Sequence, residues 1–433
     1  MITAIEVLVG FLIMLGLMGA GIHVSVAIFT VAALGTLMYL GTPLLYSFGD
    51  VLWGTLNDFI LTSIPLFILL GELLLRSGIT ERMYSALSVW LNRMPGGLLH
   101  TNIGASSVFA AMSGSSVATA ATIGTVALPA FAERGYNERL ALGTLAAGAT
   151  LGILIPPSIN MIIYGAITNT SIGKLFIAGI LPGLALAGAF MLAIIAFSLL
   201  RPDVAGEAEP RASLRERLVS LVDLLPPAFV FAIVMGSIYS GWATPTEAAA
   251  LGVVAALVLA AINRKLSLAM LHECFLSMAR TTAMIMLIIV AAFFLNYIVG
   301  ILGIPHTLTQ WVADLGLSPL GLILALVIFY LVLGCFLETL SMMIATVPIV
   351  VPMVVQFGFD PVWFGIFLVI MMEISLITPP IGMNLYVVQG VRGRGSIGDV
   401  MLGSLPFLAI MLLFVGLIIL WPGLVLWLPG AVG

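Results

Sequence analysis

One pattern occurs twice in this chain, as Leu154-Ile155-Pro156-Pro157-Ser158-Ile159-Asn160 and again as Ile377-Thr378-Pro379-Pro380-Ile381-Gly382-Met383-Asn384. The difference in number between Pro379 and Pro156 is called the repeat offset below. Each proline pair also follows an earlier proline, Pro129 or Pro352, at the same spacing (156 − 129 and 379 − 352). A double proline inside an apolar run interrupts a helix, and a membrane protein tolerates this only where the freed backbone groups find partners. Two interrupted helices at corresponding positions therefore predict a binding site between two repeats.

The composition is that of a membrane protein with several helical spans. Of the 433 residues, 62% are apolar and 8% are charged, and the mean hydropathy is +1.24. Soluble domains carry about 25% charged residues. Apolar runs near the ~20 residues of a transmembrane helix recur, which predicts an all-α, polytopic fold in a lipid bilayer. No basic cluster suggests nucleic-acid binding, and Cys274 and Cys335 are interpreted as small apolar fillers.

The basic residues predict which side of the membrane each loop faces. All 15 Lys and Arg residues lie between Arg76 and Arg394, and none lies in 41–58 or in 281–391. Because basic loops of membrane proteins face the cytoplasm, the 41–58 connection is expected outside, and within 281–391 the stretch 318–357 is expected to begin and end outside. Lys174 is the one basic residue that this path places outside.

Two stretches are too short to cross the membrane twice and return to the side where they began. The segment 94–133 begins and ends among cytoplasmic basic groups, whereas 318–357 begins and ends outside. Two full spans need about 40 residues plus a turn. We therefore predict two re-entrant hairpins, followed by broken helices over 139–168 and 361–390. The two units run in opposite directions, so they form an inverted-topology repeat.

These units predict how the chain is divided. Scaffold spans and a cytoplasmic loop are expected around and between the two repeats. The expected boundaries are 1–59 for the N-terminal scaffold spans, 60–182 for the first repeat with the third span, 183–280 for further scaffold spans and the cytoplasmic loop, 281–406 for the second repeat, and 397–433 for the last span and the C-terminus.

The hairpin tips and the broken helices carry the residues expected to bind an ion and a solute. Carbonyls at the end of one half-helix, with hydroxyls beside them, suit Na⁺, and the N–H groups that open the next half-helix suit an anion. Close helix packing is an alternative explanation of the small residues, and a simple kink is an alternative explanation of the prolines. Neither hairpin contains Lys or Arg, so bound cations would balance the charge of an anion. The candidate residues are Ser113, Gly114, Ser115, Ser116, Pro156, Pro157, Ser158, Asn160, Glu338, Thr339, Glu373, Thr378, Pro379, Pro380 and Asn384, with Ser115, Ser116, Thr339 and Thr378 expected nearest to Na⁺.

Three acidic residues lie inside apolar segments, where an ionisable group costs about 2.5–3.5 kcal/mol on insertion scales. Glu338, at the second tip, is expected to orient that tip through hydrogen bonds or to take part in cation coordination. Glu373, shortly before Thr378, fits either a functional or a structural role. Glu72 is expected to pair with Arg76 one helical turn later.

The sequence lacks the residue patterns of an enzyme. It contains no HExxH, GxSxG or phosphate-binding Gly-rich motif, so no cofactor and no ATP hydrolysis are expected. Any coupling must then come from an ion gradient or the membrane potential. The four histidines are dispersed along the chain, at His23, His100, His272 and His306.

Six motifs resemble those of the large membrane subunit of TRAP (tripartite ATP-independent periplasmic) transporters, and the likeness runs essentially end to end. The most specific are Ala111–Ala120, around the first tip, and Gly152–Ser158, at the first double proline. The others are Ile64-Pro65-Leu66-Phe67 with Gly71-Glu72, Ala178–Gly183, Thr244–Ala249 and Thr378–Gly382.

The resemblance implies a multi-pass transporter of a bacterial or archaeal cytoplasmic membrane, which couples Na⁺ to the uptake of a small organic anion such as a C4-dicarboxylate or a sugar acid. It also implies an elevator motion of a hairpin-bearing domain, a small membrane subunit as a separate chain, and a periplasmic substrate-binding protein. A stand-alone Na⁺/dicarboxylate carrier of related fold is the first alternative. An integral membrane enzyme or assembly scaffold is the alternative from another class. The family's tip and break positions correspond to Ser113–Ser116, Pro156–Ser158, Glu338-Thr339 and Thr378–Pro380.

Overall fold

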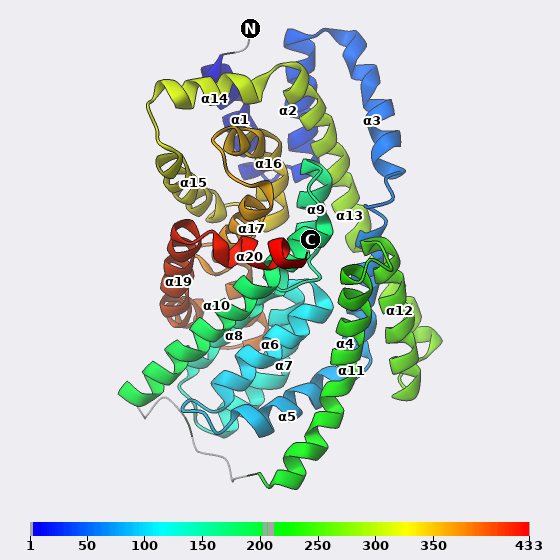
Figure 1. Ribbon diagram of the computed structural model, residues 1–433, viewed down its shortest axis with the longest axis vertical. Helices are drawn as coiled ribbons and strands as arrows, with labels where there is room; N and C mark the ends of the chain where they lie inside the picture. The colour runs from blue at the N-terminus through cyan, green and yellow to red at the C-terminus, as the bar shows by residue number, and fades with distance from the viewer. Residues whose placement is uncertain (1–2, 202–205, 207–211, 433) are drawn as a thin grey trace.

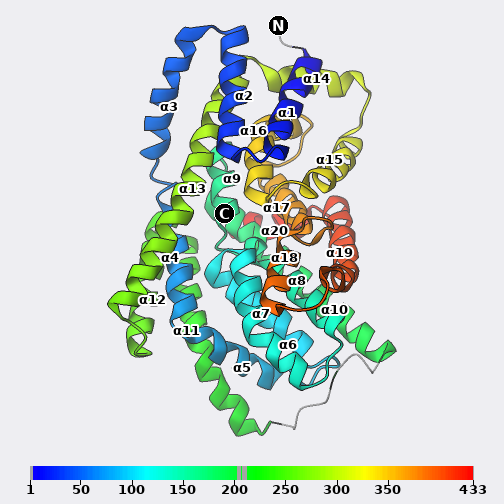
Figure 2. The same ribbon diagram turned by 180° about the vertical axis from the view of Figure 1, so that it is seen from behind.

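The computed structural model describes residues 3–201, 206 and 212–432, and every regular element in these ranges is a helix (Figures 1 and 2). Seven of these helices, and α8 taken together with α9, are long and apolar enough to cross a bilayer, and two bent pairs, α4 with α5 and α14 with α15, pass the same test together. The elements are α1 (Ala4–Gly19), α2 (Val24–Tyr39), η1 (Thr42–Tyr46), α3 (Ser47–Leu56), α4 (Ser63–Arg76), α5 (Ile79–Leu91), α6 (Leu98–Ser113), α7 (Ser116–Glu133), α8 (Glu138–Leu154), α9 (Ile159–Thr168), α10 (Ile172–Leu200), α11 (Leu214–Tyr239), α12 (Pro245–Ile262), α13 (Leu268–Ile301), α14 (Ile304–Asp314), α15 (Pro319–Gly334), α16 (Thr339–Gln356), α17 (Pro361–Ile377), α18 (Met383–Arg392), α19 (Ile397–Leu420) and α20 (Gly423–Val432).

The sequence repeat is also a repeat of structure. Helices α7 and α16 are separated by the repeat offset at both their starts and their ends, and so are α8 and α17. The series α4 to α10 therefore corresponds to α13 to α19, element by element. Both series contain a hairpin and then a broken helix, as the sequence predicted.

The two predicted hairpins are present. Helices α6 and α7 join at Gly114-Ser115, where Gly114 has a left-handed φ of 61°, and α15 and α16 join through residues 335–338. Figures 1 and 2 show α6 and α7 in the lower half of the molecule and α15 and α16 in the upper half. The first arms have 16 residues each and the second arms 18, and only the second arms are long enough by themselves for a span.

Both double prolines interrupt their helices, which confirms the predicted breaks. Helix α8 ends at Leu154 and α9 begins at Ile159, while α17 ends at Ile377 and α18 begins at Met383. The Pro156–Pro157 and Pro379–Pro380 peptide bonds are both cis. Each break therefore places the carbonyl end of one helix next to the N–H end of another.

Four short helices were not expected from the sequence: α3, α5, α14 and α20. Helices α5 and α14 each precede a hairpin and follow a glycine in left-handed conformation, Gly78 or Gly303. Two longer helices also begin earlier than expected, α11 at Leu214 and α13 at Leu268. Part of the predicted cytoplasmic loop 201–217 is thus helical, and 202–205 and 207–211 lie outside the described residues. The hydrophobic periodicity of these segments is weak over so few turns, so their charged residues favoured a prediction of loops.

Helix α8 lies at the centre of the packed core and touches both repeats. Every residue from Ala141 to Leu154 is buried, and this stretch packs against α6, α7, α17 and α19. At Gly143 the backbones of α8 and α19 are so close that a Cβ would overlap the carbonyl oxygen of Gly403. This contact requires glycine, and it holds the first break at a fixed place relative to the second repeat.

Candidate functional site

The first hairpin tip is a helix end followed at once by a helix start. The Ser115 hydroxyl accepts the backbone N–H of Ala118 at 3.3 Å and so caps α7, while the Ser115 carbonyl accepts the Thr119 hydroxyl at 2.7 Å. The hydroxyls of Ser113 and Thr119 lie 3.3 Å apart. Ser113 and Ser116 are buried and Ser115 is half-buried. The tip therefore gathers hydroxyl and carbonyl oxygens in a largely dry environment.

The first tip packs against the first break. A Cβ at Gly114 would lie 2.8 Å from the carbonyl oxygen of Pro157, and one at Gly152 would lie 2.7 Å from the backbone nitrogen of Ser116. Beyond the prolines, the Ser158 hydroxyl accepts the backbone N–H of Met161 and caps α9. Gly114 and Gly152 therefore allow the first tip and the first break to meet backbone to backbone.

Glu373 reaches this first site from the opposite repeat. Its Oε1 atom accepts the backbone N–H of Ile153 at 3.1 Å, and its Oε2 atom lies 3.5 Å from the Ser116 hydroxyl. Glu373 is fully buried. The Ser116 hydroxyl also points to the carbonyl oxygen of Thr150, at 3.4 Å. A carboxyl group of the second repeat thus lies beside the tip and break of the first.

The second tip carries its own carboxylate. Glu338 is the N-cap of α16, and its Oε2 atom accepts both the backbone N–H of Ser341, at 3.1 Å, and the Ser341 hydroxyl, at 3.2 Å. Its Oε1 atom accepts the Thr339 hydroxyl at 3.0 Å. These are the hydrogen bonds expected if Glu338 orients the tip; that role and a part in cation coordination both stay predictions.

The second tip also packs against its own break. A Cβ at Gly334 would overlap the Cβ of Ser375, and the Cys335 thiol lies 3.6 Å from the carbonyl oxygen of Pro379. The Thr378 hydroxyl donates to the carbonyl of Ile374 at 2.7 Å. Cys335, interpreted from the sequence as a filler, therefore stands between the tip and the break.

Two asparagines occupy the second position of the helices that follow the breaks. Asn160 in α9 and Asn384 in α18 are both buried. The Asn384 amide donates to the carbonyl of Ala146 in α8 at 3.4 Å. Among the described residues, Nδ2 of Asn160 and Oδ1 of Asn384 have no hydrogen-bond partner. An unpaired buried amide is costly, so these atoms are available for a ligand.

The contacts join the predicted residues into two groups, one at each tip and break, and a pocket shared by both groups stays a prediction. Ser113–Ser116, Pro156–Ser158 and Glu373 meet at the first tip and break, whereas the second group is built around Glu338 and Thr378–Pro380. Glu72 pairs with Arg76 at 3.4 Å as expected, outside both groups.

Sequence reasoning missed the hydroxyls of Thr119 and Ser341 and the backbone carbonyl of Thr150 in these groups. The sequence repeat could have pointed to Thr150, because the repeat offset makes Thr150 the counterpart of Glu373. A position that carries a buried carboxylate in one repeat is a reasonable place to look for a polar group in the other.

The two repeats differ in what covers them. Helix α9 packs against α4, α10, α16 and α17, and all its residues from Ile159 to Ile167 are buried. In the corresponding helix α18, Met383 is 40% exposed and Tyr386 is 49% exposed, against 8% and 0% for Ile159 and Ile162. The same parts are therefore enclosed in one repeat and open in the other.

Two hairpins that meet two broken helices, in repeats of opposite direction, define a secondary membrane transporter. This chain belongs to one family of them. The model of the tripartite ATP-independent periplasmic transporter family, DctM component, matches residues 9–424.

Curated relatives agree with the family. The chain is 38% identical to the C4-dicarboxylate TRAP transporter large permease protein DctM of Pseudomonas aeruginosa, over 84% of each chain. It is 34% identical to the sialic acid TRAP transporter large permease protein SiaM of Vibrio cholerae, over 92% of each. It is 32% identical to the isethionate TRAP transporter permease protein DctMQ of Oleidesulfovibrio alaskensis, over 95% of this chain and 64% of that protein.

Solved structures share the fold at lower identity. The YdaH transporter of Alcanivorax borkumensis superposes with a TM-score of 0.66 at 16% identity, over 90% of both chains. MtrF of Neisseria gonorrhoeae, described as one of a class of antimetabolite efflux pumps, gives 0.53 at 15% identity, over 89% of this chain and 85% of that one. These likenesses support the fold class that the sequence predicted.

Proposed function

We propose that this chain is the large permease subunit of a Na⁺-coupled transporter that imports a small organic anion across a bacterial inner membrane. A periplasmic binding protein delivers the anion, and a small membrane subunit completes the complex. The observation that carries the proposal is the pair of tip-and-break groups, each of which combines helix-end carbonyls, hydroxyls and one carboxylate.

The charges of the two groups suit monovalent cations. Glu373 is the carboxylate of the first group and Glu338 that of the second, and helix-end carbonyls are the ligands that broken membrane helices offer to Na⁺. One Na⁺ beside each carboxylate removes the net charge of both groups. The starts of α9 and α18, with the amides of Asn160 and Asn384, then face an anion with positive helix ends and free polar atoms.

Organic acids are the substrate class that the relatives support. The three similar permeases carry the names of C4-dicarboxylate, sialic acid and isethionate transporters, and all three solutes are organic anions. A C4-dicarboxylate or a sugar acid is accordingly proposed for this chain. Because no Lys or Arg lies in either hairpin, recognition of the anion depends on helix ends, hydroxyls and bound cations.

The unequal covering of the repeats supports an alternating mechanism of the elevator type. The exposed helix α18 leads to Arg392 and Arg394 on the predicted cytoplasmic side, and the enclosed helix α9 leads to the outer side. This structure is accordingly assigned to a cytoplasm-facing state. Movement of the hairpin-bearing unit past α4 and α13 exchanges the exposure of α9 and α18.

Proteoliposome uptake tests the proposal. The chain is reconstituted with its small membrane subunit and binding protein, and uptake of labelled organic acid is compared with and without an inward Na⁺ gradient. Accumulation is expected only with the gradient and only with the loaded binding protein. Accumulation that ignores Na⁺ contradicts the coupling, and Na⁺-driven uptake without any binding protein favours the stand-alone carrier instead.

A further inference from the structure

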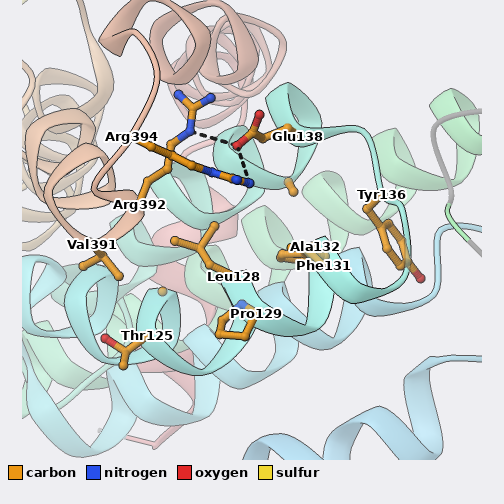
Figure 3. A pocket seen from close by; sticks show the side chains of 12 residues that line it. Thr125, Leu128, Pro129, Phe131, Ala132, Tyr136, Glu138, Val391, Arg392 and Arg394 are labelled. Carbon is orange, nitrogen blue, oxygen red and sulfur yellow. Dashed lines mark hydrogen bonds and ion pairs between the residues drawn. The ribbon is translucent and has the colours of Figure 1, made fainter.

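A cavity of about 660 Å³ lies where α7 ends, α8 begins and α18 ends, apart from both tip-and-break groups (Figure 3). Its volume is within the range of about 300–1,000 Å³ that is usual for small-molecule sites. Figure 3 shows Glu138, Arg392 and Arg394 along one edge of the cavity, and Thr125, Leu128 and Pro129 of α7 along the opposite edge. None of the candidate residues for transport lines it.

Arg392 is a fixed part of the charged edge. Its Nε atom lies 3.0 Å from Oε1 of Glu138, and its side chain also donates to Asp399, at 3.2 Å, and to the carbonyl of Ser396, at 3.1 Å. The Arg392 side chain is only 6% exposed. These contacts use three of its five N–H donors and tie α18 to α8 and α19, so the buried Arg392 side chain mainly shapes the cavity.

Arg394 is in a different position. Its side chain is 71% exposed, and among the described residues its guanidinium has one contact, 3.5 Å from Oε1 of Glu138. A guanidinium has five N–H donors in a planar fork that matches carboxylate and phosphate oxygens. Most of these donors are therefore free at the edge of the cavity.

The charges of this cluster leave a positive excess. The cluster joins three guanidinium groups to two carboxylates through direct ion pairs, so its net charge is +1. A bound anion with one negative charge would bring the net charge of the cluster to zero. The members of the cluster are Arg139, Arg392, Arg394, Glu138 and Asp399.

The rest of the lining is mostly apolar, so the ligand must have an apolar part beside its charge. We propose that this cavity binds one carboxylate or phosphate group carried on a partly apolar body, with the Arg394 guanidinium as its main contact. The apolar part rests on Leu128, Pro129 and Ala132. Two sources offer this chemistry on the cytoplasmic side: a soluble organic acid, and the headgroup of an anionic lipid.

Binding to the purified full chain tests the proposal in Na⁺-free potassium buffer, so the outcome is independent of the transport proposal. In one arm the thermal midpoint of the detergent-solubilised chain is followed against succinate, hexanoate and inorganic phosphate. In the other arm, lipid vesicles of phosphatidylcholine with and without cardiolipin receive the chain. Stabilisation in the first arm identifies a soluble acid as ligand and stabilisation in the second a lipid headgroup, and either result supports the site.

Two variants separate the site from non-specific binding. Arg394→Ala removes the main contact, and Ala132→Phe fills the cavity while it keeps every charge. Arg394→Ala is expected to raise the half-saturating concentration of the effective anion about tenfold, the scale of one lost charge-assisted hydrogen bond. Ala132→Phe is expected to raise it by about as much, because the ligand's apolar part must compete with the added ring for space. Arg93→Ala, at another exposed basic position, is the matched control and keeps the parent response. The proposal is overturned if the parent responds to no anion in either arm, or if both variants respond as the parent does.

Discussion

The carboxylate of Glu373, in α17, accepts a hydrogen bond from the backbone N–H of Ile153, in α8, at 3.1 Å across 220 residues of chain. The second repeat thereby completes a group of polar atoms that otherwise belongs to the first. Thr150, the residue of α8 that corresponds to Glu373, has no charge, so the two repeats are not chemically equal at this point.

Glu373→Gln tests whether that charge is used for Na⁺. Glutamine still accepts the N–H of Ile153, so the packing is expected to survive while the attraction for a cation is lost. We expect the Na⁺ concentration for half-maximal uptake to rise about tenfold or more, since an interaction with a charged group contributes about 1.5–3 kcal/mol. The measurement is proteoliposome uptake against external Na⁺. An unchanged Na⁺ dependence would show that Glu373 is structural.

Ser115→Leu and Ser116→Leu are expected to abolish transport, because a bulky apolar side chain replaces an oxygen where the tip meets the break. Insertion and folding are expected to be largely intact, as judged by yield and gel-filtration profile. Ser107→Leu is the control on the same hairpin, since the Ser107 hydroxyl only donates within its own helix, to the carbonyl of Ile103 at 2.8 Å. Near-normal uptake by both tip variants refutes a role of the tip in binding.

Gly152→Ala tests the contact between the first tip and the first break. The added Cβ would lie 2.7 Å from the backbone nitrogen of Ser116, so the tip must shift, and overpacking of this kind costs about 1–3 kcal/mol. Uptake is expected to fall strongly and the thermal midpoint to fall by a few degrees. Gly390→Ala, where a Cβ meets no atom within 4 Å, should change neither quantity. Equal behaviour of the two variants counts against a close contact.

Gly143→Ala tests the packing of α8 on α19. A Cβ that overlaps the carbonyl oxygen of Gly403 cannot be accommodated unless the helices separate. We expect a loss of at least about 3 kcal/mol of stability, at the upper end of overpacking costs, and a low yield of monodisperse protein. Gly416→Ala in α19, which meets no atom within 4 Å, is the control and keeps the parent's stability. A parent-like thermal midpoint for Gly143→Ala disproves the close approach.

Local sequence signals predicted most of the fold, and they located the hairpin tips and the helix breaks of the candidate site. Proline spacing located both breaks, and the charge pattern located both hairpins, because chain interruption and charge placement depend on nearby residues alone. The repeat offset also predicted that Ser115 and Glu338 occupy equivalent positions, and in the structure both are the N-caps of the second hairpin arms. Short amphipathic helices such as α5 were missed, because a segment of a few turns that lies between Arg76 and Arg93 looks like a loop.

The contacts between the repeats could not be predicted. Nothing near Glu373 in the sequence indicates that its partners are Ile153 and Ser116, since that pairing depends on how α17 lies across α8. The role of Cys335 was missed for the same reason, because its neighbour Pro379 is 44 residues away. Long-range packing decides these contacts, and one sequence contains no direct record of it.

The contrast between the enclosed α9 and the open α18 shows that two repeats with the same parts can differ in exposure. Tip, break and following helix are supplied in duplicate, so neither copy by itself distinguishes inside from outside. The direction of transport then depends on the neighbours of each copy, because α4, α10, α16 and α17 cover α9, whereas α18 leaves Met383 and Tyr386 exposed.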